Sequence, residues 1–79
     1  MYTLEMARAF KSVEHFCPKG FVLEVVDNEH FLTLRANEVH FMRLLDEDKR
    51  RAVEYMVRAK KALEDNGAVV LLVREGGKK

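Results

Sequence analysis

Apolar residues near the start of the chain recur every three or four positions, which predicts an amphipathic helix. These positions are Met6, Phe10, Val13 and Cys17. Thr3 is a residue type that caps helix N-termini, and the turn-forming run Pro18-Lys19-Gly20 predicts the end of the helix. We therefore expect Cys17 to be the last core residue of this helix, with a largely buried thiol.

Two runs of β-forming residues follow, over residues 21–26 and 31–36. The polar segment 27–30 between them has the composition of a turn, so the two runs are expected to pair as a hairpin. Apolar residues alternate in the second run, which predicts that Leu32, Leu34 and Ala36 face the core.

The segment 38–45 fits two structures. Val39, Phe41 and Leu45 have the spacing of a third strand. Phe41, Leu44 and Leu45 equally fit a short helix capped by Asn37. We favour the strand and keep the helix as the alternative.

A long helix is predicted from an N-cap at Asp46 to the closing pair Asn66-Gly67. Its apolar stripe consists of Ala52, Val53, Met56, Ala59, Ala62 and Leu63. Residues 68–73 are apolar on both faces and predict a buried strand. The order α-β-β-(β)-α-β predicts an α+β fold, a small mostly antiparallel sheet of three to four strands packed with two helices. We expect one domain over 1–75 and a flexible tail over 76–79.

Composition narrows the class of protein. The chain has 79 residues, of which 48% are hydrophobic and 34% charged, as in one small folded domain. Its net charge of +1 argues against a basic nucleic-acid coat or a polybasic membrane anchor, and no apolar run is long enough to cross a membrane. A single cysteine and the lack of a signal-peptide pattern predict a cytoplasmic protein.

Uncharged polar residues are scarce. Only six of the Ser, Thr, Asn and Gln group occur beside fourteen Lys and Arg and thirteen Asp and Glu, and Gln is absent. A charge-rich, amide-poor composition is typical of thermophile proteins, so a thermophilic origin is one interpretation. Coding bias in a short chain is the other.

The residues that bind metals or act as nucleophiles do not form a recognisable motif. His15, Cys17, His30 and His40 match no spacing of structural zinc sites. The hairpin would place His30 far from Cys17, so at most the other three converge. Because no residue is evident to orient a Cys-His pair, we predict no catalytic site, metal or cofactor, and no enzyme activity.

A cluster of basic residues lies on the long helix. A nucleic-acid-binding domain, the second hypothesis for function, would use Arg50, Arg51, Arg58 and Lys61. Acidic residues are interleaved with them, and Arg50, Glu54 and Arg58 form a ladder of i,i+4 pairs. Such a ladder is typical of a solvated helix face.

The ending Leu71-Leu72-Val73-Arg74-Glu75-Gly76-Gly77 resembles the diglycine tail of ubiquitin-like and sulfur-carrier proteins. A hairpin, a helix and a further strand precede that tail in the β-grasp family as well. The resemblance implies a carrier that is activated at Gly77 after trimming. The N-terminal helix and the absence of a strand after Val73 depart from the family order.

The first and last predicted strands are apolar on both sides, whereas two helices in so short a chain cover one sheet face. An uncovered apolar face then contacts a second copy or another protein. This predicts a non-enzymatic interaction module, a homodimer in the simplest case, with candidate anchors at Phe21, Val22, Val26 and Phe31. In the alternative, the first helix crosses over and buries the second face.

Overall fold

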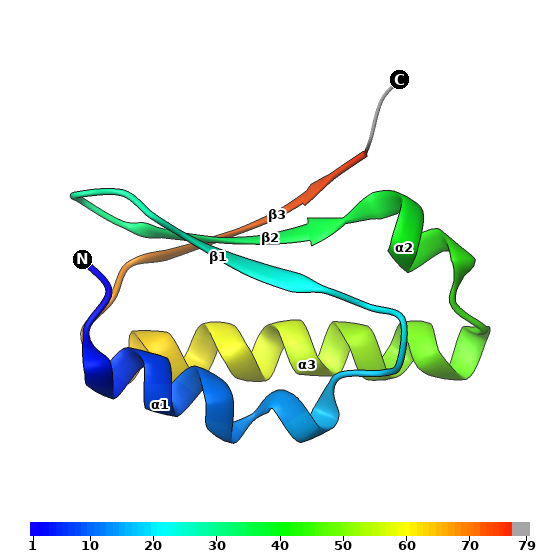
Figure 1. Ribbon diagram of the computed structural model, residues 1–79, viewed down its shortest axis with the longest axis horizontal. Helices are drawn as coiled ribbons and strands as arrows, with labels where there is room; N and C mark the ends of the chain where they lie inside the picture. The colour runs from blue at the N-terminus through cyan, green and yellow to red at the C-terminus, as the bar shows by residue number, and fades with distance from the viewer. Residues whose placement is uncertain (77–79) are drawn as a thin grey trace.

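Within residues 1–76, three strands form a mixed sheet with the order β1-β2-β3, and the helices α1 and α3 pack beneath it (Figure 1). The computed structural model describes residues 1–76. Its elements are α1 (Leu4–Ser12), the 3-10 helix η1 (Glu14–Phe16), β1 (Leu23–Asp27), β2 (Leu32–Asn37), α2 (Glu38–Arg43), α3 (Asp46–Glu64) and β3 (Val70–Glu75). The predicted α+β class and the order α-β-β-α-β are confirmed. Of the tail predicted over 76–79, only Gly76 is among the described residues. Residues 77–79, which include the second glycine of the diglycine ending, lie outside them.

Both kinds of strand pairing occur in the sheet, which is mixed rather than mostly antiparallel. β1 and β2 form the predicted antiparallel hairpin, with Val25 opposite Leu34. β2 and β3 run parallel, with Leu34 opposite Leu72. Parallel neighbours need a long crossover connection, and α2 and α3 together provide it.

The ambiguous segment after β2 is a helix, so the strand that we favoured for it is wrong. The Asn37 side chain accepts a hydrogen bond from the backbone N–H of His40 at 2.9 Å, which caps the N-terminus of α2. Phe41 is buried on the inner side of α2, where its ring centroid lies 6.2 Å from that of Phe21. The cap and this one anchor fix a helix of less than two turns.

The helix ends follow local signals at most positions. Thr3 Oγ1 accepts a bond from the Met6 N–H at 3.1 Å, as predicted. α1 ends at Ser12, earlier than expected, and the chain then forms η1. Leu45, not Asp46, occupies the N-cap position of α3, without a side-chain bond. Gly67 has a φ of 95°, the left-handed conformation that ends a helix at little cost for glycine.

The core lies between the sheet and the helices α1 and α3. Leu32, Leu34 and Ala36 are buried at its centre, as alternation in β2 predicted. The core residues of α3 are Ala52, Tyr55, Met56, Ala59 and Leu63. Val53, predicted to join this stripe, is 47% exposed, so the buried stripe is narrower on that side and includes Tyr55 instead. Within residues 1–76, none of the helices combines the length and apolar composition needed to cross a lipid bilayer.

Candidate functional site

The side of the sheet opposite α1 and α3 is the main candidate surface, and we call it the outer face. Successive strand residues point to opposite sides, so residues that alternate with the buried Leu32, Leu34 and Ala36 point outward. The strand register and the residues flanking each strand give its members: Val22, Glu24, Val26, Phe31, Thr33, Arg35, Asn37, Val69, Leu71, Val73 and Glu75.

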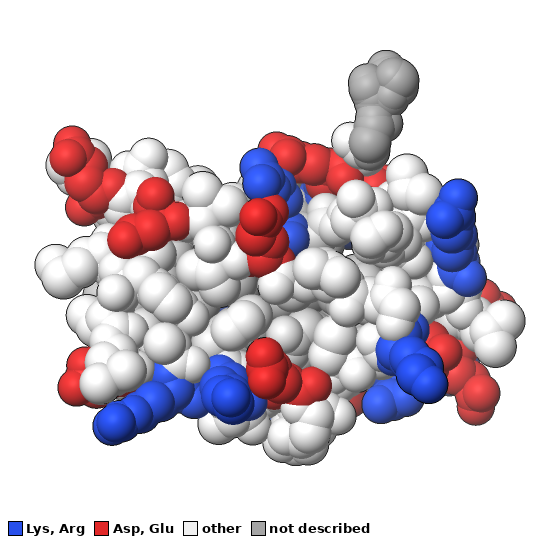
Figure 2. All heavy atoms as spheres, in the orientation of Figure 1, with Lys and Arg blue, Asp and Glu red and all other residues white. Residues whose placement is uncertain are grey.

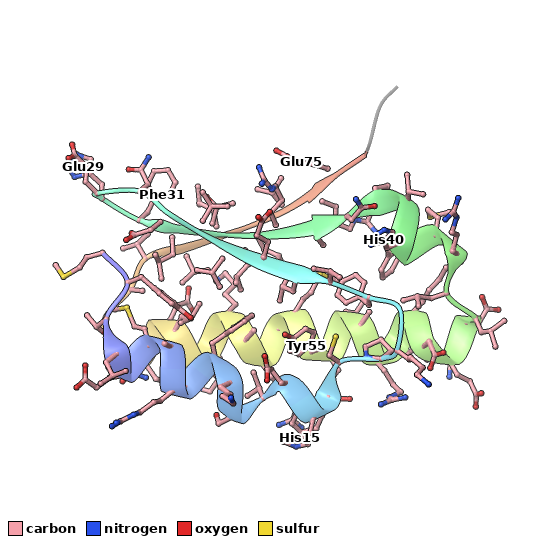
Figure 3. All side chains as sticks on the ribbon, viewed as in Figure 1. His15, Glu29, Phe31, His40, Tyr55 and Glu75 are labelled. Carbon is pink, nitrogen blue, oxygen red and sulfur yellow. The ribbon has the colours of Figure 1, made fainter. Side chains whose placement is uncertain are left out.

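Neither α1 nor α3 covers the outer face. Both helices lie on the other side of the sheet, and Figure 3 shows Phe31 and Glu75 on the side away from α3. The alternative in which the first helix crosses to the second face is therefore wrong. Val22, Val69 and Leu71 are 57%, 63% and 48% exposed. The outer face is thus a sheet surface with apolar side chains open to solvent.

Three charged side chains form a row across the outer face. Arg35 on the central strand donates to Glu24 Oε1 from Nη2 at 2.6 Å and from Nε at 3.0 Å. Its Nη1 lies 3.5 Å from Glu75 Oε1 on β3. The hydrogen bond and the charge of Glu24 raise the pKa of Arg35. Because all three side chains are solvent-exposed, the row adds little stability, but it places two carboxylates around one guanidinium.

A hollow of about 490 Å³ adjoins this row, where β1 begins and β2 and β3 end. Glu24, Arg35, Asn37, Glu75 and the α2 residue His40 contribute to its lining. His40 Nδ1 is buried without a hydrogen-bond partner among the described residues. The hollow makes the outer face concave at this end, so a partner side chain can enter between the strand ends and α2.

The four predicted anchors fall on two different sides of the sheet. Val22, Val26 and Phe31 belong to the outer face. Phe21 is only 5% exposed and packs edge-on against Phe41 and Tyr55, with ring centroids 6.2 and 6.4 Å away. Phe21 is therefore a core residue and takes no part in the outer face.

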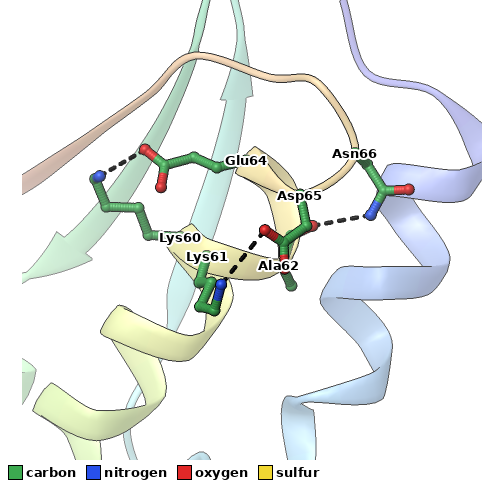
Figure 4. A network of polar contacts seen from close by, with 6 residues as sticks. All are labelled: Lys60, Lys61, Ala62, Glu64, Asp65 and Asn66. Carbon is green, nitrogen blue, oxygen red and sulfur yellow. Dashed lines mark hydrogen bonds and ion pairs between the residues drawn. The ribbon is translucent and has the colours of Figure 1, made fainter.

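The basic residues of the second hypothesis lie on the solvent side of α3, and three of the four have a carboxylate beside them. Arg50 is exposed and makes no ion pair among the described residues, so the predicted pair with Glu54 is not formed. Arg58 is 2.9 Å from Glu54, and its guanidinium lies 4.1 Å from the centre of the Phe16 ring. Arg51 is 3.5 Å from Asp48. Lys61 is 3.5 Å from Asp65, beside the pair formed by Lys60 and Glu64 (Figure 4). Figure 2 shows both signs of charge along the helices on the side that it draws.

The metal-ligating residue types are spread over different elements. His15 is on η1, Cys17 follows η1, His30 is in the hairpin turn and His40 is on α2. Within residues 1–76, no three His, Cys, Asp or Glu side chains lie close enough together to hold a metal ion.

The Cys17 thiol is half-buried and donates hydrogen bonds, at 3.2 Å to the Phe21 carbonyl and 3.5 Å to that of Pro18. Burial and, to a smaller extent, the charge of Glu14 raise its pKa. Since the thiolate is the reactive form, we expect iodoacetamide at mildly alkaline pH to modify folded Cys17 several-fold more slowly than the urea-unfolded chain. Mass spectrometry over time measures both rates. Equal rates would contradict the shielding of this thiol.

Comparison of the chain with protein-family models, with curated proteins and with solved structures finds no match.

Proposed function

We propose that the protein is a small non-enzymatic interaction module that binds protein through its outer face, with a second copy of the chain as the partner. One observation carries the proposal. Helices α1 and α3 pack on the same side of the sheet, and apolar residues of β1 and β3 point to the opposite side. The apolar residues of the outer face are thus left for another protein to cover.

Physical chemistry favours burial of this surface. Removing apolar area from water gains about 25 cal/mol per Å². Val26 on β1, Leu71 on β3 and Phe31, which directly precedes β2, lie on the hairpin side of the charged row, so they can form the apolar centre of a contact. Val22 lies on the other side of that row. The charged row around Arg35 would supply selectivity, because a partner must match two carboxylates and one guanidinium.

The test is the mass in solution. Light scattering coupled to size exclusion, at high micromolar concentration, should give at least twice the chain mass of 9.2 kDa. Val26→Lys and Val22→Lys should each reduce the mass at least twofold, because a buried ammonium in the contact lacks a partner.

The matched control is Leu4→Lys, which places the same charge on α1, on the helix side of the sheet, at a position 62% exposed. It should leave the mass unchanged. A wild-type mass of one chain, or masses that Val26→Lys and Val22→Lys do not alter, would remove the outer face as a self-contact.

A further inference from the structure

β3 is an edge strand with main-chain groups directed away from the sheet. The Leu32 N–H donates to the Val69 carbonyl at 2.8 Å, which fixes the pairing phase between β2 and β3. In a parallel ladder, only alternate residues of a strand bond to a given neighbour. The N–H and C=O groups of Val70, Leu72 and Arg74 therefore point away from β2, in the plane of the sheet. Such an edge is a template for one more strand.

The opposite edge of the sheet is partly occupied. The N-terminal ammonium lies 2.8 Å from Asp27 Oδ1 and donates to the Asn28 carbonyl at 3.2 Å, and the Tyr2 N–H donates to Asp27 Oδ2. The start of the chain thus lies against the hairpin end of β1. β3 is therefore the edge better suited to accept another strand.

Apolar side chains flank the β3 edge on both sides of the sheet. Leu71 on the outer face is 48% exposed, and Leu72 on the helix side is 39% exposed. On α3, Tyr55 contacts Phe10 of α1, so helical spacing places the exposed Val53 and Val57 on the flank away from α1. We call the β3 edge, with Leu71, Leu72, Val53 and Val57, the β3 margin.

We infer that the β3 margin joins a second copy of the chain, β3 against β3 and antiparallel, in a register centred on Leu72. The inference deepens the proposed function and rests on it, because it specifies how copies assemble around the outer face. The product is a continuous six-stranded sheet with the helices of both copies on one side.

The strand sequence selects this register. Leu72 lies at the middle of residues 69–75, so pairing Leu72 with Leu72 aligns the whole strand. Arg74 then faces Val70, and Glu75 faces Val69. A register shifted toward the C-terminus would bring Arg74 opposite Arg74, and like charges directly opposite destabilise a strand pair.

Contact area favours a second copy as the occupant. Three strands at about 4.8 Å spacing and six residues at about 3.3 Å give the outer face a projected area of roughly 300 Å². A stable interface buries about 800 Å² on each partner. Joining two copies at the β3 margin doubles the continuous outer face that is available for binding.

The two contacts are geometrically compatible. The twofold axis that joins β3 to β3 is perpendicular to the sheet, whereas the axis that brings two outer faces together lies parallel to it. Perpendicular twofold axes that meet generate a closed tetramer with dihedral symmetry. We therefore expect an assembly of about four chain masses.

A charge exchange at one position tests the register. Leu72→Lys and Leu72→Glu should each halve the mass found by light scattering, because like charges then face each other at the centre of the seam. An equimolar mixture of the two variants should recover the wild-type mass. Recovery requires position 72 of one copy to face position 72 of the other, which a merely misfolded variant cannot reproduce.

Disulfide formation provides an independent measurement in a Cys17→Ser background. Leu72→Cys should crosslink on mild oxidation, since opposite residues in the proposed seam have Cα atoms about 5.5 Å apart. Leu71→Cys is the control, because in this seam position 71 faces position 73 of the other copy.

Each outcome separates the two proposals. If neither Leu72 variant changes the mass and Leu72→Cys does not crosslink, the edge seam is wrong, whatever Val26→Lys does. If the Leu72 variants dissociate the assembly while Val26→Lys does not, the seam is correct and self-contact through the outer face is wrong. A crosslink by Leu71→Cys alone would overturn the seam and place the partner on the outer face.

Discussion

Replacing Leu34 with alanine should lower the free energy of unfolding by about 2 to 5 kcal/mol, the range for large-to-small changes in a close-packed core. Leu34 is 0% exposed and lies at the centre of β2, between Val25 on one neighbouring strand and Leu72 on the other. Truncation leaves a cavity between β1, β3 and the helix layer, and these elements cannot all move inward to fill it. Urea unfolding followed by circular dichroism measures the loss.

The expected loss for Leu34→Ala is a large fraction of the total stability of the domain. A domain of 79 residues is stable by only about 4 to 12 kcal/mol. Leu4→Ala removes the same atoms at a position 62% exposed and should cost less than about 0.5 kcal/mol. Similar losses for Leu34→Ala and Leu4→Ala would contradict the arrangement of the core.

Raising the pH above 10 should destabilise the fold through Tyr55. Burial, followed by negative charge at Cys17, Glu14 and Tyr2, raises the pKa of Tyr55 to about 12. The unfolded chain has a tyrosine pKa of about 10, so between these values the folded state binds more protons and stability falls as pH rises. At about 1.4 kcal/mol per pKa unit, the loss approaches 2 to 3 kcal/mol, and all of this contribution is present below pH 10.

Two variants isolate this titration. Tyr55→Phe should show a shallower loss of stability than the wild-type chain between pH 10 and 12, with unfolding followed by urea at each pH. In Tyr2→Phe, Tyr55 is the remaining tyrosine, and the loss of the Tyr2 charge lowers the Tyr55 pKa a little. The phenolate absorbance of Tyr55 should still appear well above pH 10, because burial is the largest cause of its raised pKa. Phenolate formation near pH 10 in folded Tyr2→Phe would contradict the raised pKa of the buried Tyr55 side chain.

Local sequence predicted most elements because strong short-range signals specify them. Thr3 and Gly67 close helix ends through their own side-chain or backbone properties. The segment after Asn37 lacked such a decisive signal, since the spacing of Phe41 and Leu45 suits a strand as well as a helix. The choice depends on the Asn37 cap together with the contact of Phe41 with Phe21, which lies far away in the sequence.

The candidate site was predictable only in part, for a similar reason. Alternation along the first strand places Val22 and Val26 on one side, opposite the core residue Leu23. The row formed by Glu24, Arg35 and Glu75 was missed, because its members come from three strands whose register the sequence does not reveal. A parallel register between β2 and β3 depends on the length and packing of the crossover, not on local pairing signals.

The parallel pairing of β2 with β3 also implies an order of folding events. The hairpin of β1 and β2 closes over a four-residue turn, whereas β3 can dock only after α2 and α3 have formed or collapsed between them. Until then the central strand β2 has a bare edge, with Leu32 and Leu34 incompletely covered. During synthesis this interval lasts until β3 itself emerges, because α2 and α3 precede it in the chain. The docking of β3 onto β2 is thus the step that completes the native strand order of the sheet.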